Sequence, residues 1–219
     1  VVHACAWLME RQLDKVAGEL LQRSLEARGM TFRMNESTQA LLAGKNGRVS
    51  SIQFKDGTQL PAELVVMAVG IRPNTTLAEQ MNLYCDRGIV VSDTMQTITD
   101  PRVYAVGECA AHRGIAYGLV APLFEQGKVL ANHLAEFGIG RYTGSLTSTK
   151  LKVTGIDLFS AGEFMGTDDG RTEEIVLSDP HEGVYKKLVI RDNQLVGACL
   201  FGDTVDGSWY FKLLREGRN

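Results

Sequence analysis

The first strongly periodic segment of the chain alternates apolar and polar positions at the spacing of a helix. Apolar residues fall on one face, and polar side chains such as Glu19 and Arg23 fill the other. Gly29 follows at a position that favours the end of a helix. The apolar positions are Leu13, Val16, Ala17, Leu20, Leu21 and Leu25. The pattern predicts an amphipathic helix, preceded by the end of a parallel strand at Val1–His3.

Between residues 31 and 54 the pattern changes to the period of two that is typical of strands. Ile52 and Phe54 alternate with polar neighbours. The turn signals Asn46-Gly47 and Asp56-Gly57 bound this run, and both dipeptides are typical of hairpins. We therefore expect a small antiparallel meander.

Two runs without polar interruption are typical of strands that are buried on both faces of a parallel sheet. The first is Leu64–Val69, which Gly70 ends, and the second is Val103–Val106. Between them we expect a short helix at Leu77–Asn82 and a further strand at Gly88–Val91. The chain is thus predicted to return to a parallel sheet after the meander.

A second helix is predicted after residues 118–121, where Pro122 suits the first helical position. Leu123, Leu130 and Leu134 lie on one face of this helix, and His112 belongs to an exposed loop before it. The amino terminus of the helix presents unpaired N–H groups and the positive end of the helix dipole. It would stabilise a negative charge in front of it; packing on the sheet alone is the alternative.

The C-terminal part follows a polar segment, residues 141–149, that has the composition of a linker. A last helix carries Trp209 and Phe211, and the region is predicted to be a small α+β domain. Met165–Gly170 is acidic but lacks the ligand spacing of a calcium loop, so we expect no metal there. The predicted strands are Lys150–Val153, Leu158–Ala161, Glu174–Leu177, Val184–Arg191 and Leu195–Phe201.

Composition and charge exclude several classes of function. The chain has 219 residues and a formal net charge of -3, which argues against a nucleic-acid partner. No apolar run approaches the ~20 residues that span a bilayer, and no basic leader is present, so we expect a cytoplasmic protein. The four cysteines are far apart, which argues against a zinc site and a redox-active dithiol. We expect reduced thiols and no metal.

The segment around Gly107 and Glu108 carries the candidate chemistry. Gly107 permits close approach of the backbone, and Glu108 places a carboxylate at the carboxyl end of a predicted strand, where open α/β sheets bind ligands. An acid there suits a ribose or polyol hydroxyl; an ordinary acidic loop is the alternative. His3 stands at another strand end, where an acid would favour NAD, so the usual rule cannot separate NADH from NADPH. A surface histidine is the alternative for His3.

Several motifs occur in a consistent order along nearly the whole chain. They are His3, Leu8–Asp14, Gly70–Pro73, Gly107–Cys109, Tyr117–Pro122 and Lys150–Gly155. Together they resemble the FAD-dependent pyridine-nucleotide oxidoreductases, and among them the large subunits of NADH-dependent assimilatory nitrite reductases. The resemblance implies an α/β chain: an incomplete Rossmann-like FAD/NAD(P)-binding fold, with a parallel sheet and an antiparallel meander, followed by a small C-terminal α+β domain.

The resemblance also implies a division of the chain and a path for electrons. Residues 1–76 would be the back portion of the NAD-binding domain, 77–144 the returning segment of the FAD-binding domain, and 145–219 the interface domain. In the resembled enzymes electrons pass from NADH through FAD to a metal centre that reduces nitrite to ammonia. The implied partners are the rest of such an enzyme, with its iron–sulfur and sirohaem centres, and a second copy bound through the C-terminal domain.

The site residues that the resemblance implies hold cofactors rather than catalyse proton transfer. No catalytic side chain is implied, because the flavin and nicotinamide carry the chemistry. Arg72 is a candidate electrostatic contact, with a solvated loop arginine as the alternative. The implied FAD contacts are Gly107, Glu108, Val120, Ala121, Pro122 and Leu123, and the implied NAD contacts are His3, Val69, Gly70 and Arg72.

Neither a flavin nor a nicotinamide Gly-x-Gly-x-x-Gly fingerprint occurs in the chain, and no initiator methionine begins it. We therefore expect a piece of a longer enzyme that is inactive alone and whose own binding of FAD is in question. Two other interpretations stay open. One is a related rubredoxin or ferredoxin reductase, and the other is a non-catalytic module for dimerisation or docking.

Overall fold

The computed structural model of the protein describes residues 1–167 and 170–217. It divides into two compact units, Val1–Met67 with Ser148–Asn219, and Ala68–Thr147. The acidic loop in which we expected no metal includes residues 168–169, which lie outside the described residues. Within the described ranges, no helix is long and apolar enough to cross a bilayer.

The C-terminal part of the first unit is a sheet of five strands in the order β7-β8-β11-β10-β9. All of its pairings are antiparallel. The predicted strands of this region are confirmed. Local patterns sufficed to predict them, because most pairings join strands that are consecutive in the chain. The strands are β7 (Ser148–Val153), β8 (Ile156–Gly162), β9 (Thr172–Asp179), β10 (Val184–Arg191) and β11 (Gln194–Phe201).

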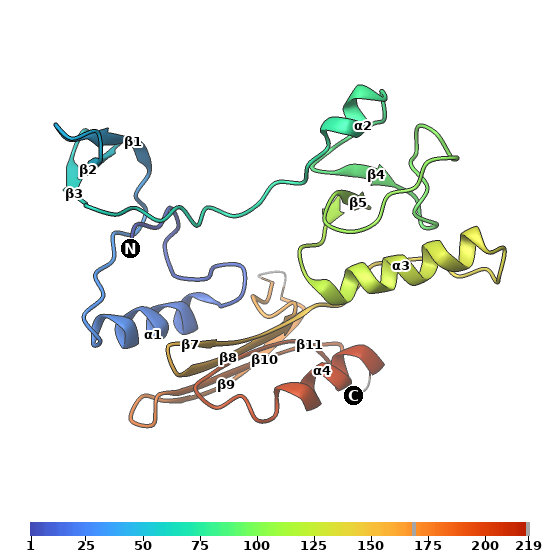
Figure 1. The fold of residues 1–219 in the computed structure, drawn as a ribbon. Helices are drawn as coiled ribbons and strands as arrows, with labels where there is room; N and C mark the ends of the chain where they lie inside the picture. The colour runs from blue at the N-terminus through green and yellow to red at the C-terminus, as the bar shows by residue number, and fades with distance from the viewer. Residues whose placement is uncertain (168–169, 218–219) are drawn as a thin grey trace. The chain divides into compact units, whose positions relative to one another are not determined.

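Two helices, α1 (Lys15–Glu26) and α4 (Gly207–Glu216), cover opposite faces of this sheet (Figure 1). The face beneath α1 carries Leu158 and Cys199, and the face beneath α4 carries Phe159 and Leu200. Successive side chains of a strand point to opposite faces, so neighbours in sequence belong to different core clusters. The predicted amphipathic helix is thereby confirmed as α1, and its apolar face is buried.

A buried polar network joins α1 to the sheet. Asp14 caps the helix: its Oδ1 accepts a hydrogen bond from Ala17 N at 3.0 Å, and its Oδ2 accepts one from the Tyr185 hydroxyl at 2.7 Å. The Lys187 ammonium lies 3.2 Å from Asp14 Oδ2 and 3.1 Å from Glu174 Oε1. Asp14 and Lys187 are only 6% and 5% exposed. No local sequence pattern indicates this network, because Asp14 and Tyr185 are 171 positions apart.

Burial and charge set the protonation of the network. Burial would lower the pKa of Lys187, but the hydrogen bonds and charges of Glu174 and Asp14 outweigh it, so the pKa is raised. Burial and the hydrogen bond to Asp14 raise the pKa of Tyr185. Burial also raises the pKa of the nearby Cys199 thiol to about 12. At neutral pH the network therefore holds a charged lysine together with a neutral phenol and a neutral thiol.

The meander predicted before residue 62 is confirmed. It consists of β1 (Thr38–Ala43), β2 (Val49–Phe54) and β3 (Gln59–Pro61), paired antiparallel in that order. Gly47 and Gly57 stand in its two turns with φ of +74° and +86°, a backbone conformation that favours glycine. The Asn-Gly and Asp-Gly signals therefore located both turns correctly.

The second unit combines a small mixed sheet with two helices. Strand β4 pairs in parallel with β5, and β5 pairs antiparallel with β6. The core of this unit gathers around Met95, which is fully buried. The predicted short helix and the strand that follows it are confirmed as α2 and β4. The elements are α2 (Thr76–Gln80), β4 (Ile89–Val91), β5 (Ala110–His112), β6 (Ile115–Ala116) and α3 (Val120–Leu134).

Two predicted strands are wrong. Leu64–Val69 forms no regular strand, and most of its side chains are exposed, Val69 to 90%. In Val103–Val106 only Tyr104 pairs, through an isolated bridge to Gln96. A parallel strand needs hydrogen-bonded neighbours along its edges, and among the described residues no strand lies alongside either run. The apolar pattern alone therefore did not show whether these runs pair in a sheet.

Three expectations about α3 and the loop before it need correction. Helix α3 begins at Val120, so Pro122 is its third residue rather than its first. Its buried residues are Pro122 and Gln126, whereas Leu134 is largely exposed. His112 is 1% exposed at the end of β5 rather than in an exposed loop, because its ring packs on Tyr142 and its Nε2 lies 2.8 Å from a carboxylate oxygen of Asp93.

We expect Asp14→Asn to lower the free energy of unfolding by about 2–4 kcal/mol, because it removes the negative charge beside the buried Lys187. Asparagine caps helices as well as aspartate does, so the capping bond to Ala17 is preserved. The measurement is urea unfolding followed by circular dichroism. Glu19→Gln, at a partly exposed helix position with two weak ion pairs to Lys15 and Arg23, is the control and should change stability by less than about 0.5 kcal/mol. Equal effects of the two changes would contradict the network's role.

Asp93 makes the second unit sensitive to acid. Hydrogen bonds from Arg113 and His112 hold the pKa of Asp93 down at about 2. Because this pKa lies below the value of about 3.9 in the unfolded chain, its stabilising contribution is present above that value. It is lost as the pH falls toward 2. Thermal melts of Asp93→Asn should therefore show a smaller loss of stability between pH 5 and pH 3 than melts of the parent chain. Parallel losses would contradict this assignment.

Candidate functional site

The Gly107–Glu108 turn lies between the single bridge at Tyr104 and strand β5. Gly107 has φ of +95°, in the region that favours glycine. A Cβ built at this position meets no atom within 4 Å, so the space in front of the turn is open. The turn therefore combines a permissive backbone with room for a ligand to approach.

Gln126 of α3 holds this turn in place. The side chain is completely buried, and its Oε1 accepts a hydrogen bond from the backbone N–H of Gly107 at 3.0 Å. Its Nε2 has no hydrogen-bond partner among the described residues. The bond places the Gly107–Glu108 turn beside the amino-terminal half of α3. Sequence reasoning missed Gln126, although the residues three and four positions away on the same helix face (Pro122, Leu123, Val129 and Leu130) are apolar, which is a usable signal for a buried polar group.

The amino terminus of α3 carries no side-chain cap. Its N-cap residue is Leu119, which cannot accept the hydrogen bonds that Ser, Thr, Asp or Asn would accept. The N–H groups of Val120 and Ala121 belong to the first turn, and Pro122 has no N–H at all. This helix start therefore offers backbone donors and the positive end of a dipole to a negatively charged group.

Glu108 is exposed, and its carboxylate forms no ion pair or hydrogen bond with any described residue. A carboxylate oxygen in this position can accept hydrogen bonds from hydroxyl groups of a ligand. Gly107 and Glu108, which sequence reasoning predicted, thus share one turn, and Gln126 links that turn to the helix of Val120, Ala121 and the other predicted flavin contacts.

The exposed side of α3 forms an open groove of about 440 Å³. Its lining is mostly apolar, and Phe124 and Val120 are both 68% exposed. The lining residues are Val120, Leu123, Phe124, Gly127, Lys128 and Ala131. The helix thus presents an apolar surface next to its uncapped start.

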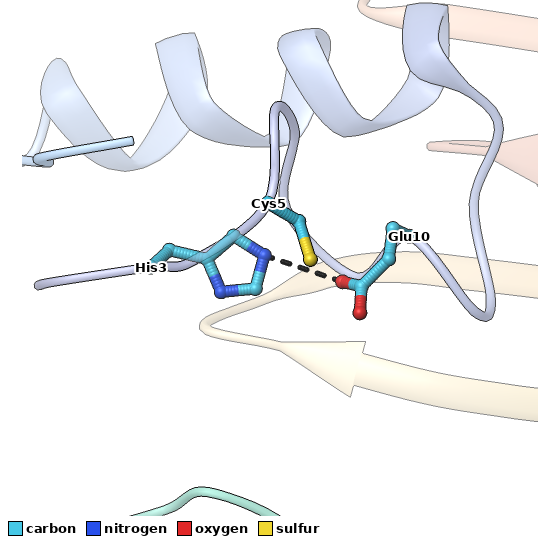
Figure 2. A group of neighbouring side chains, drawn as sticks. All are labelled: His3, Cys5 and Glu10. Carbon is cyan, nitrogen blue, oxygen red and sulfur yellow. Dashed lines mark ion pairs between the residues drawn. The ribbon is translucent and has the colours of Figure 1, made fainter. Parts of the chain in front are cut away.

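The residues predicted to contact NAD fall in different units. His3 lies in the first unit, at the end of a segment in which Val2 forms a parallel bridge to Arg33, and its Nε2 lies 3.2 Å from Glu10 Oε2 (Figure 2). The segment from Val69 to Arg72 lies in the second unit and is exposed throughout. Gly70 there has φ of +85°. Val69, Gly70 and Arg72 therefore lie together in one segment of the second unit, whereas His3 lies in the first unit.

Comparison with known families and proteins gives consistent matches along the chain. The profile described as pyridine nucleotide-disulphide oxidoreductase matches residues 1–131, and the profile of the rubredoxin NAD+ reductase C-terminal domain matches residues 148–218. The chain is 51% identical over 216 residues to a nitrite reductase (NAD(P)H) of Bacillus subtilis strain 168. It is 47% identical over 206 residues to an assimilatory nitrate reductase electron transfer subunit of the same organism.

The matches cover almost all of this chain but a minor part of the relatives. The two alignments include 99% and 94% of this chain and 26% of each Bacillus protein, so the chain spans about a quarter of their length. Among solved structures, a ferredoxin reductase from Rhodopseudomonas palustris has a TM-score of 0.84, covering 100% of this chain and 54% of its own. At 20% identity this likeness concerns the fold, and it confirms the predicted α/β class.

We expect Gln126→Leu to destabilise the chain by about 1–3 kcal/mol, because the Gly107 N–H loses the hydrogen-bond acceptor that Gln126 provides and stays partly buried. Hydrogen exchange of the Gly107 amide, measured by NMR, should become faster in the same variant. Gln80→Leu, at the exposed end of α2, is the matched control and should change neither quantity. Unchanged exchange at Gly107 in Gln126→Leu would show that Gln126 does not hold the turn.

Proposed function

Because this chain belongs to the pyridine nucleotide-disulphide oxidoreductase family, we propose that it forms part of the module that carries electrons from NADH to FAD in an assimilatory nitrite reductase. The observation that carries the proposal is the turn of Gly107 and Glu108, which Gln126 joins to the uncapped start of α3. The two Bacillus relatives, a nitrite reductase and a nitrate-assimilation electron transfer subunit, support the choice of electron acceptor. The family and these relatives imply the use of FAD and NAD(P)H.

The residues around Gly107 suit the ribityl part of a flavin. Glu108 would accept hydrogen bonds from ribityl hydroxyls, and the positive φ of Gly107 would let the backbone approach them without a Cβ in the way. A free carboxylate and open space are what such a contact needs. FAD, when bound, supplies the redox chemistry by accepting hydride from the nicotinamide and passing electrons on.

The start of α3 would hold the pyrimidine edge of the flavin ring. A reduced flavin carries negative charge there, and the N–H groups of Val120 and Ala121 with the helix dipole would stabilise it by about 0.3–1 kcal/mol in an exposed setting and up to about 2 kcal/mol when partly buried. Pro122 and Leu123 would shape the contact with the ring edge. No side chain of this chain needs to move a proton for hydride transfer, and we assign no catalytic residue.

The nicotinamide nucleotide would contact the chain along Val69, Gly70 and Arg72 of the second unit. Arg72 is exposed and offers a positive charge to a phosphate or carboxamide edge. We assign residues 1–76 to the NAD-binding portion, 77–144 to the FAD-binding portion and 145–219 to an interface domain. The match of residues 148–218 to a reductase C-terminal domain supports the last of these.

The remaining sites of the reaction would lie in other parts of a larger enzyme. Its iron–sulfur and sirohaem centres would receive the electrons and reduce nitrite to ammonia, in the cytoplasm, and the C-terminal domain would form a homodimer contact. A rubredoxin-type reductase is the second candidate, supported by 32% identity over 123 residues to a rubredoxin-NAD(+) reductase of Pseudomonas putida. The higher identity and coverage of the nitrite reductase match favour the first.

The flavin contact is tested by titrating the chain into riboflavin and FAD and following flavin fluorescence. The residues named here would contact the ribityl chain and the ring of the flavin, and the sequence contains no glycine fingerprint that would bind the pyrophosphate. The two ligands should therefore bind with dissociation constants within about threefold of each other, a difference of under about 0.7 kcal/mol. Glu108→Gln should weaken both about tenfold, because hydrogen bonds to a charged group are worth about 1.5–3 kcal/mol.

Glu182→Gln, in the exposed turn between β9 and β10, is the matched control and should leave flavin binding unchanged. If Glu108→Gln and Glu182→Gln behave alike, Glu108 does not hold the ribityl chain. If neither flavin binds at saturating protein, the non-catalytic docking module becomes the better description of this chain.

A further inference from the structure

Three side chains of different chemistry converge in the loop that precedes α1. His3, Cys5 and Glu10 each offer one ligand atom, and these atoms all lie within 4.8 Å of one another. Figure 2 shows the imidazole, the thiol and the carboxylate directed toward a common point. His3 Nε2 and Glu10 Oε2 are 3.2 Å apart, and all three residues are partly exposed.

The backbone around these ligands is fixed by pairing with the segment that leads into β1. His3 N donates to Arg33 O at 2.9 Å, and His3 O accepts from Glu36 N at 3.0 Å. Cys5 O accepts from Asn35 N at 3.2 Å. The two ligand positions nearest the amino terminus are therefore held by main-chain hydrogen bonds, so a bound ion would not need to order them.

The nitrogen of His3 that faces the cluster meets two oxygen acceptors. Its Nε2 lies 3.0 Å from the carbonyl oxygen of Trp7 as well as 3.2 Å from Glu10 Oε2. Trp7 is itself fixed, because its indole N–H donates to Leu13 O at 3.0 Å. A ring nitrogen between two acceptors must carry a proton or face a cation. With its proton on Nδ1, His3 would direct the Nε2 lone pair at a metal ion.

The thiol completes the same arrangement. The Cys5 sulfur lies within 4.8 Å of the Glu10 carboxylate oxygen and of the His3 imidazole nitrogen. A divalent ion bound among them would displace the thiol proton to solvent and gain a bond to each group. The carboxylate, the sulfur and the imidazole would then all bind one metal cation, which takes the place of their protons.

We propose that His3, Cys5 and Glu10 form a three-ligand site for Zn²⁺, with water in the fourth position. Imidazole, thiolate and carboxylate are the ligands that zinc takes in proteins, and tetrahedral bonds of about 2.0–2.3 Å separate neighbouring ligand atoms by about 3.3–3.8 Å. Separations within 4.8 Å reach that range by small side-chain rotations. Ca²⁺ and Mg²⁺ prefer oxygen ligands, so a site with sulfur and nitrogen selects against them.

The spacing explains why the sequence alone did not indicate the site. The ligands are separated by one residue and by four residues, and no close pair of cysteines or histidines is present. The turns between Cys5 and Glu10 bring the third ligand back to the first two. Zinc would clamp this loop just before the Asp14 cap of α1.

Cobalt(II) is the probe that tests the site, because its thiolate complexes absorb strongly in the near ultraviolet and its tetrahedral complexes absorb in the visible. The full chain, purified without a histidine tag, should develop both bands with one equivalent of Co²⁺, and Zn²⁺ should abolish them. Cys5→Ser should remove the sulfur-to-cobalt band. Glu10→Gln and His3→Gln should each weaken Zn²⁺ binding at least tenfold in competition with a chromogenic chelator, since even outer-shell changes cost about 10–100-fold.

Cys85→Ser and Cys109→Ser are the matched controls, because both cysteines are partly exposed free thiols outside the cluster. They should leave both cobalt bands unchanged. Circular dichroism checks that each variant is folded. If Cys5→Ser does not fold, the weakened Zn²⁺ binding of Glu10→Gln tests the site in its place. The proposal is overturned if stoichiometric Co²⁺ gives no thiolate band, or if the band persists in Cys5→Ser, or if a control variant removes it.

Discussion

The packing of α1 on the five-stranded sheet depends on the buried carboxylate of Asp14. Asp14 accepts hydrogen bonds from the first turn of the helix and from Tyr185, and it faces the ammonium of Lys187. A lysine with so little exposure needs such a partner, since a buried charge without one is strongly destabilising. The apolar contacts between the helix and the sheet tolerate small shifts, whereas these polar contacts do not. The network therefore fixes the start of α1 against β9 and β10 of the sheet.

Several groups of the second unit lack partners within it. Glu108 is unpaired, α3 starts without a cap, and Val69, Ile71 and the apolar residues of the α3 groove are exposed. Unpaired polar groups and exposed apolar surface both mark places where something else binds. A flavin would bind the unpaired polar groups, and another protein surface would pack on the exposed apolar residues. The proposed role in a larger electron-transfer enzyme accounts for both with one explanation.

Local signals predicted the elements that are complete within short stretches of chain. The Asn46-Gly47 turn and the alternation around Ile52 and Phe54 located the meander, and the C-terminal strands were predicted as short runs separated by turns, because these elements pair with near neighbours. The strand predicted at Val103–Val106 is wrong because only Tyr104 pairs, in an isolated antiparallel bridge to Gln96, and an apolar run does not reveal whether a parallel neighbour is present. Gln126 and the Asp14 network were missed because their partners are distant in the sequence. Glu108 stays a prediction: an acid beside a glycine is a local pattern, and the structure places it in an exposed turn.

The central claim, that the turn of Gly107 and Glu108 and the start of α3 form one flavin-binding edge, is tested most directly by NMR. Riboflavin added to the nitrogen-15-labelled chain should shift the backbone amide signals of Gly107, Glu108, Val120 and Ala121 together, with one common dissociation constant. Shifts centred on the far end of the α3 groove or in the first unit, with these four amides unmoved, would contradict the account.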